Sequence, residues 1–169
     1  MAEIKSTLDL IMERTKNLTL TEEEKKAIRA KEVKSRVRGW FQRYSDGALI
    51  IRDLKENMEQ ERAAFPEAAT LLREECLAHL EPAADNQKIF QIMGEILGID
   101  AAPFRRLIDD FHEEILQHRD GATRDSLDTL RAQGISGTAL IPNLDLSPAW
   151  NAYLESAHKQ FLSKLYLVK

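Results

Sequence analysis

Apolar residues recur at alternating steps of three and four between residues 30 and 58 of this chain. This spacing places them on one stripe of an α-helix and predicts a seam that packs against other helices along most of its length. We expect contacts with partner helices, or with further copies of the protein, to lie along this seam. Its members are Val33, Val37, Trp40, Tyr44, Ile51, Leu54 and Met58, with Ala30 and Gly47 in the same register.

Local signals mark where this helical region begins and leave its middle open. Thr21 and Glu24 have the spacing of a capping box, and acidic residues in the first turn suit the positive end of a helix. Asp46 and Gly47 indicate a C-cap that divides the region into two helices. The unbroken spacing of the seam instead favours one continuous helix, and the aromatic and β-branched flanks are also compatible with a β-hairpin turn.

Shorter helical patterns fill most of the remaining chain. The fold class is therefore all-α, a bundle of about six to eight helices organised around a long helix or helical hairpin at residues 21–59. We expect an N-terminal part, residues 1–60, and a C-terminal bundle, residues 61–169, or one continuous domain. The further predicted helices cover residues 2–17, 66–80, 86–97, 103–119, 123–134 and 148 to the C-terminal region.

The segment 134–148 differs from the rest because it lacks helical periodicity. Long irregular connections in compact domains are often functional or cover a cavity. Its apolar residues, such as Leu144, either seal the end of the bundle or cover a small-ligand pocket. The polar side chains that would line such a pocket are Ser136, Thr138, Asn143 and Asp145.

The charge is divided unevenly along the chain. The net charge is −4, yet residues 25–44 hold eight basic residues and one acidic residue, or +7. The other 16 basic and 27 acidic residues give −11. A basic helix in an acidic chain either meets an external polyanion or packs against its own acidic neighbours. The candidate polyanion-binding residues are Lys31, Lys34, Arg36 and Arg38.

Two pairs resemble the Glu-x-x-His spacing of di-metal bundles, Glu155 with His158 and Asp109 with His112. On a helical wheel both carboxylates lie about 140° from the apolar stripe of their helix, so they point to solvent. We therefore predict no metal site. His118 falls in the last turn of its predicted helix, which indicates a capping or core histidine.

The composition also limits the class of protein. One cysteine, Cys76, precludes an internal disulfide, and its helical spacing indicates a core position rather than a nucleophile. No apolar run approaches the roughly 18 residues of a membrane helix, and the first residues lead into no signal-peptide core. We expect a cytoplasmic protein with no cofactor and no membrane partner.

The stretch EIKSTLDLIMERTKNLTLTEEEK at residues 3–25, the basic helix after it and Tyr44-Ser45-Asp46-Gly47 resemble a family of uncharacterised bacterial all-helical proteins. The resemblance implies a helical fold in a bacterial cytoplasm. It implies no activity and assigns no functional residue.

These patterns favour a non-enzymatic helical module for protein–protein interaction or self-assembly, with a homo-oligomer or a helical protein as its partner. Two alternatives remain. One is a nucleic-acid-associated regulatory protein that uses the basic helix at residues 25–43. The other is a small-ligand or enzymatic site under the loop at residues 134–148.

Overall fold

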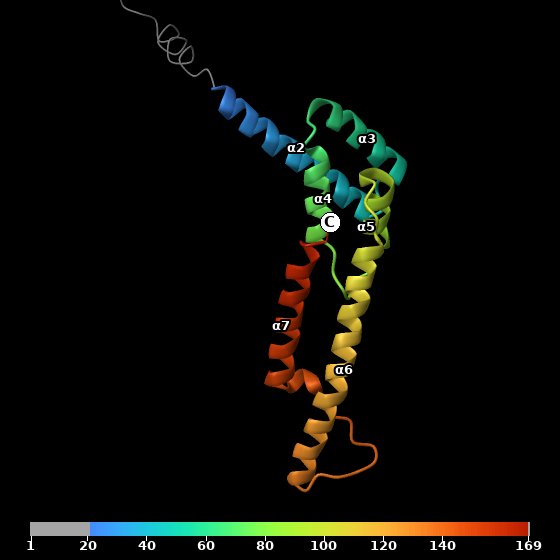
Figure 1. Cartoon of the computed structure of the whole chain (residues 1–169), viewed down its shortest axis with the longest axis vertical. Coiled ribbons are helices and arrows are strands. Elements are labelled where there is room, and N and C mark those ends of the chain that lie inside the picture. The colour runs from blue at the N-terminus through green and yellow to red at the C-terminus, as the bar shows by residue number, and fades with distance from the viewer. Residues whose placement is uncertain (1–20, 169) are drawn as a thin grey trace, which may run out of the picture. The chain divides into compact units, whose positions relative to one another are not determined.

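The computed structural model describes residues 21–168, which contain helices and no β-strand (Figure 1). The all-α prediction is confirmed, and the helix predicted at residues 2–17 lies outside the described residues. The α-helices are α2 (Glu22–Ser45), α3 (Ile51–Ala64), α4 (Ala68–Ala78), α5 (Gln87–Ile92), α6 (Ala102–Ala132) and α7 (Pro148–Leu165). A π-helix, Met93–Leu97, continues α5, and a 3₁₀ turn, Leu144–Leu146, precedes α7.

The chain forms two compact units, the first ending at Leu72 and the second beginning at Arg73. This boundary falls within α4. The division after residue 60 that the sequence favours stays a prediction.

In the first unit, α2 and α3 are separate helices that pack together. The capping box at the start of α2 is confirmed: the Glu24 amide donates to Thr21 Oγ1 over 3.2 Å, and the Thr21 amide donates to Glu24 Oε2 over 2.8 Å. Gly47 has a φ of 78°, a left-handed conformation that most side chains disfavour, and the chain turns there. The two-helix interpretation is confirmed, and the continuous helix and the β-hairpin are both wrong.

The seam forms the core of this unit. Its most deeply buried members are Val33, Val37, Leu54 and Met58, each 0% exposed. Trp40 and Ile51 are only half-buried, whereas Phe41, which the seam omits, is 2% exposed. A helix turns every 3.6 residues, so beyond Val37 the stripe drifts from a strict three-four repeat and takes in Phe41. Tyr44 is also buried.

In the second unit, a compact core forms around the ends of α4, α5 and α6. Cys76, Leu80, Ile92, Met93 and Phe104 are at most 1% exposed. Burial raises the pKa of the Cys76 thiol to about 12, so it is a poor nucleophile near neutral pH. The predicted helix 86–97 exists, but its last five residues form the π-helix, which Gly98 closes at a φ of 66°.

The prediction of two helices at residues 103–119 and 123–134 is wrong, because α6 runs unbroken through Gly121. Glycine in a helix interior costs only about 1 kcal/mol relative to alanine, which packing can offset. Thr123 does not cap a new helix; its hydroxyl donates to the Arg119 carbonyl over 2.7 Å, within the same helix.

Helix α7 lies antiparallel to α6 (Figure 1). It begins as predicted, with Ser147 as N-cap and Pro148 in the first turn. Phe161 and Phe111 join the two helices edge-to-face, with ring centroids 5.4 Å apart. Trp150, Ala157, Phe161 and Leu165 of this helix are buried.

Candidate interaction surface

An apolar groove opens in the first unit between α2 and the start of α4, with a volume of about 420 Å³. Its wall is almost wholly apolar, and its rim carries charges of both signs. Two basic residues stand on the α2 side and one acidic residue, Glu67, stands on the α4 side. The groove is lined by Ala30, Lys31, Lys34, Phe65, Glu67, Thr70 and Leu71.

The four basic residues proposed for polyanion binding do not form one site. Lys31, Lys34 and Arg38 are exposed and lie at i, i+3 and i+7, on one face of α2. None of the three forms an ion pair within residues 21–168. Arg36 lies on another side of the helix. Its Nη2 and Nε atoms donate to the two carboxylate oxygens of Glu61 in α3, over 2.7 and 2.9 Å. The hydrogen bond to this carboxylate raises the pKa of Arg36.

The seam does not present a free surface. Its fully buried members are Val33, Val37, Leu54 and Met58. The Arg36–Glu61 pair and a hydrogen bond of 3.3 Å from Arg29 to the Ala64 carbonyl also hold α2 and α3 together. Self-association through the seam would require the helices that cover it to separate. An exposed surface is therefore a better place to look for a partner.

Such a surface lies on α6, where Leu116 is 59% exposed. Acidic residues at i−7, i−3 and i+4 share its face of the helix, and all three are exposed: Asp109, Glu113 and Asp120. Arg119 borders the opposite edge. We call Leu116 with these three acidic residues the acidic leucine face. This face was not predicted from the sequence, although the spacing of its acidic residues around one leucine is a signal that could have indicated it.

The loop between α6 and α7 brings only two of its four candidate residues to a cavity. Asn143 and Asp145 line a recess of about 530 Å³, together with Arg119 of α6 and Trp150 of α7. Asn143 Oδ1 accepts from the Asp145 amide over 3.1 Å and thereby caps the 3₁₀ turn. Ser136 and Thr138 are exposed and lie outside this recess.

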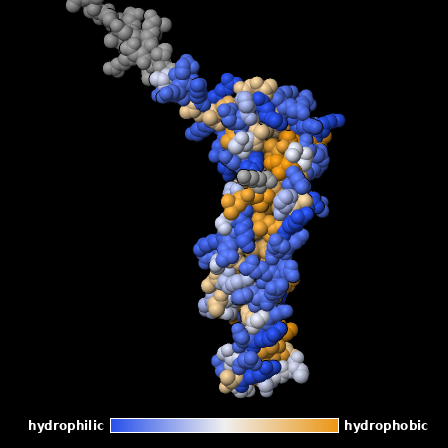
Figure 2. Space-filling view, in the orientation of Figure 1, coloured by the Kyte–Doolittle hydropathy of each residue, from blue (hydrophilic) through white to orange (hydrophobic). Residues whose placement is uncertain are grey.

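The apolar residues of the loop have different environments. Leu144 is buried and anchors the loop, whereas Ile135 is 46% exposed and Ile141 is 90% exposed. Figure 2 shows apolar surface over the C-terminal end of α6 and the loop that follows it. The loop therefore seals the bundle through Leu144 and leaves other apolar side chains in contact with solvent.

Two of the four residues with metal-site spacing, Glu155 and His112, have other partners in the structure. Glu155 accepts from Lys159 over 2.6 Å, and this hydrogen bond lowers the pKa of Glu155. The Nε2 atom of His112 lies 2.8 Å from the Pro82 carbonyl. No group of three or more His, Cys, Asp or Glu residues suited to a metal ion occurs among residues 21–168.

The interpretation of His118 as a helix-terminal residue is wrong, since α6 continues for more than three turns beyond it. Its ring instead stacks on Tyr153 of α7 at a centroid distance of 3.6 Å.

Comparison of the chain with models of protein families, with curated proteins and with solved structures finds no match. None of the helices in the described part of the chain combines the length and the apolar character needed to cross a bilayer.

Proposed function

We propose that this protein is a self-associating helical module in which the acidic leucine face of one copy docks into the α2–α4 groove of another. The observation that carries the proposal is the match between the two surfaces. In the proposed contact, an apolar groove with lysines on one rim and Glu67 on the other meets a leucine with acidic residues on one side and Arg119 on the other. Both kinds of rim contact are then attractive.

The charged residues of the two surfaces support docking because they are not already paired within residues 21–168. Lys31 and Lys34 have no acidic partner within the described residues, and neither Asp109 nor Asp120 has a basic one. Glu113 accepts only a long hydrogen bond, 3.4 Å, from Gln117 of its own helix. New pairs would therefore form without breaking ion pairs within the chain.

One contact of this size is weak. Burying a leucine contributes about 1.5–3 kcal/mol, and each exposed charge pair contributes less than about 1 kcal/mol. The cost of association offsets most of this gain, so we expect a weak single contact, with a dissociation constant of roughly 1 mM at the tightest. Because the two surfaces differ, copies add head to tail, and each contact leaves a free groove and a free leucine face for the next.

Charge reversal with rescue tests this arrangement. The wild type should show a molar mass in sedimentation velocity that rises between about 10 µM and 1 mM. The variant K31E/K34E and the variant E113K/D120K should each stay monomeric, because like charges then meet across the contact. Mixing the two variants should restore association. The acidic groove of K31E/K34E can then bind the basic face of E113K/D120K, and the basic groove of E113K/D120K can bind the acidic face of K31E/K34E.

A matched pair of leucine variants completes the test. Leu116→Glu should abolish association, whereas Leu162→Glu, at a leucine of α7 that is 37% exposed, should leave it unchanged. A wild type that stays monomeric over the whole range contradicts the proposal. So does a mixture of the two charge variants that associates no better than either alone.

Nucleic-acid binding is a second candidate, favoured by the stripe of three exposed, unpaired basic residues on α2. Lys31, Lys34 and Arg38 could contact successive phosphates and release about three counterions, so the slope of log K against log salt would be about −2.7. We expect fluorescence anisotropy to detect binding of mixed-sequence DNA at about 50 mM salt and its loss by about 200 mM.

The control for this second candidate is Arg36→Gln, which removes a basic residue that Glu61 already holds. It should bind DNA almost as well as the wild type, whereas Arg38→Gln should reduce both the affinity and the salt slope. Absence of binding at the lower salt concentration would exclude this function.

A further inference from the structure

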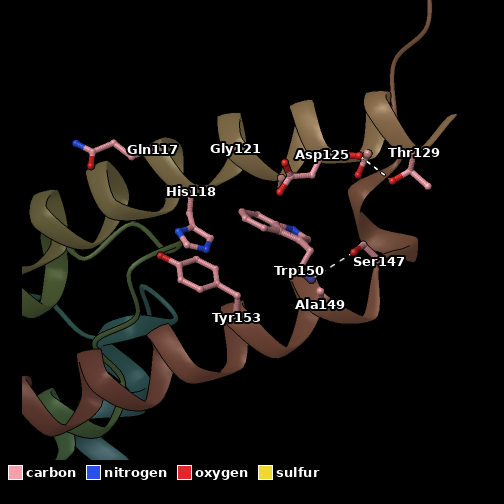
Figure 3. A pocket seen from close by; sticks show the side chains of 11 residues that line it. Gln117, His118, Gly121, Asp125, Thr129, Ser147, Ala149, Trp150 and Tyr153 are labelled. Atoms are coloured by element: carbon pink, nitrogen blue, oxygen red, sulfur yellow. Dashed lines mark hydrogen bonds between the residues drawn. The ribbon is translucent and has the colours of Figure 1, made fainter. Parts of the chain in front are cut away.

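A second recess lies between the C-terminal half of α6 and the first turns of α7 (Figure 3). Its volume is about 450 Å³, within the usual range for small-molecule sites. Trp150 also borders the recess under the 134–148 loop, but none of the four loop residues predicted as ligands (Ser136, Thr138, Asn143 and Asp145) lines this second recess.

One wall of this recess is aromatic. The rings of His118 and Tyr153 are stacked, with an angle of 9° between their planes. The ring centroids of Trp150 and Tyr153 are 5.8 Å apart. Trp150 is only 7% exposed, so packing fixes its orientation. The phenol of Tyr153 is neutral near physiological pH, and burial and the neighbouring Glu114 raise its pKa further. A cluster of aromatic rings suits the binding of a flat or cationic group.

The other wall supplies one negative charge. Asp125 is the only Asp, Glu, Lys or Arg among the lining residues, and within residues 21–168 its carboxylate has no basic partner. Figure 3 shows Asp125 on α6 beside the Trp150 ring, with His118 on the other side of that ring. Gln117 and Ser126 add polar groups along the same helix.

The start of α7 also borders the recess, but it does not favour an anion. Ser147 Oγ accepts from the Trp150 amide over 3.4 Å, and the Ser147 carbonyl accepts from the Asn151 amide over 3.1 Å. The helix start is therefore partly satisfied, and Asp125 is the only Asp, Glu, Lys or Arg that lines the recess.

We propose that this recess binds a small organic cation, with its ring or hydrocarbon part on Trp150 and Tyr153 and its ammonium group near Asp125. The wall of stacked rings and the single carboxylate select for such a molecule, and the same carboxylate repels an anion of equal shape. This binding is independent of self-association, because neither the groove nor the acidic leucine face lines the recess.

Tryptophan fluorescence gives a direct test, since the chain has two tryptophans, Trp40 and Trp150. In a Trp40→Phe variant, emission on excitation at the red edge of tryptophan absorption reports on Trp150 alone. The probes are 2-phenylethylamine, phenylacetate and 2-phenylethanol, which share a phenyl ring and carry positive, negative and no charge. We expect saturable binding of the amine that is at least about tenfold tighter than that of phenylacetate.

Two variants on α6 identify the carboxylate. Asp125→Asn should remove the preference for the amine over the alcohol, whereas Asp128→Asn, three residues away and outside the recess, should keep it. Saturation-transfer NMR on the unsubstituted chain should give the same order of probes. Equal binding of amine and phenylacetate, an unchanged preference in Asp125→Asn, or no saturable binding of the amine up to about 10 mM would each overturn the proposal.

Discussion

Val37→Asp is expected to unfold the first unit rather than to separate copies of the protein. Val37 is fully buried on α2, where an aspartate would be a charge without a partner. A substitution of this kind costs about 3–5 kcal/mol, a large part of the roughly 5–15 kcal/mol that stabilises a typical domain. Denaturant unfolding followed by circular dichroism should show a lower midpoint, or loss of the helical signal at the start of the titration.

Ile28→Asp is the matched control, because Ile28 lies on the same helix and is 45% exposed. Its effect on the free energy of unfolding should be within about 0.5 kcal/mol. The opposite pattern, in which Val37→Asp keeps the wild-type unfolding transition and only weakens association, would make the seam an intermolecular interface. It would contradict the internal core described above.

Phe161→Ala is expected to have the second large effect, on the second unit. The Phe161 side chain is 2% exposed and packs edge-to-face on Phe111, so its removal leaves a cavity between α6 and α7. Truncation of a buried phenylalanine costs about 3–5 kcal/mol. Thermal unfolding should shift to lower temperature, and proteolysis should begin between α6 and α7.

The neighbouring Leu162→Ala provides the comparison, because Leu162 is 37% exposed and loses much less buried area. We expect a cost below about 1 kcal/mol for this change. If both variants unfold at the same temperature, the contact between α6 and α7 does not contribute to the stability of the second unit as the burial implies.

Features determined by neighbouring residues could be predicted from the sequence. The start of α2 depends on Thr21 and Glu24 alone, and the start of α7 depends on Ser147 and Pro148. The seam could be predicted from the spacing of apolar residues, because burial of one face of a helix requires that spacing. These signals suffice for the all-α class and for the main core positions of α2 and α3.

Features that depend on packing were missed. Gly121 and Thr123 form a local signal for the end of one helix and the start of the next. The packing of α6 against α7 and the loop outweighs the small free-energy cost of a glycine inside a helix. The π-helix at Met93–Leu97 leaves no distinct pattern in the sequence, and we have no physical account of it. Phe41 was omitted because a strict three-four register diverges from the true period of a helix.

The candidate interaction surface was only partly predictable, because it combines residues that are distant in the sequence. Lys31 and Lys34 were identified from charge, but the apolar groove beside them exists only because Phe65 and Leu71 lie next to α2. The sequence does not distinguish Arg36 from the other basic residues of α2, because Glu61, which binds it, lies on another helix. Spacing along one helix carries no information about such partners.

The short connection between α2 and α3 has a consequence for the synthesis of the chain. Only Asp46–Ile50 separates the two helices, so their pairing closes a small loop and costs little chain entropy. Contacts of this kind form rapidly, and all of the residues that make them precede the second unit on the ribosome. The first unit therefore has what it needs to begin packing during translation, before α6 and α7 have been made.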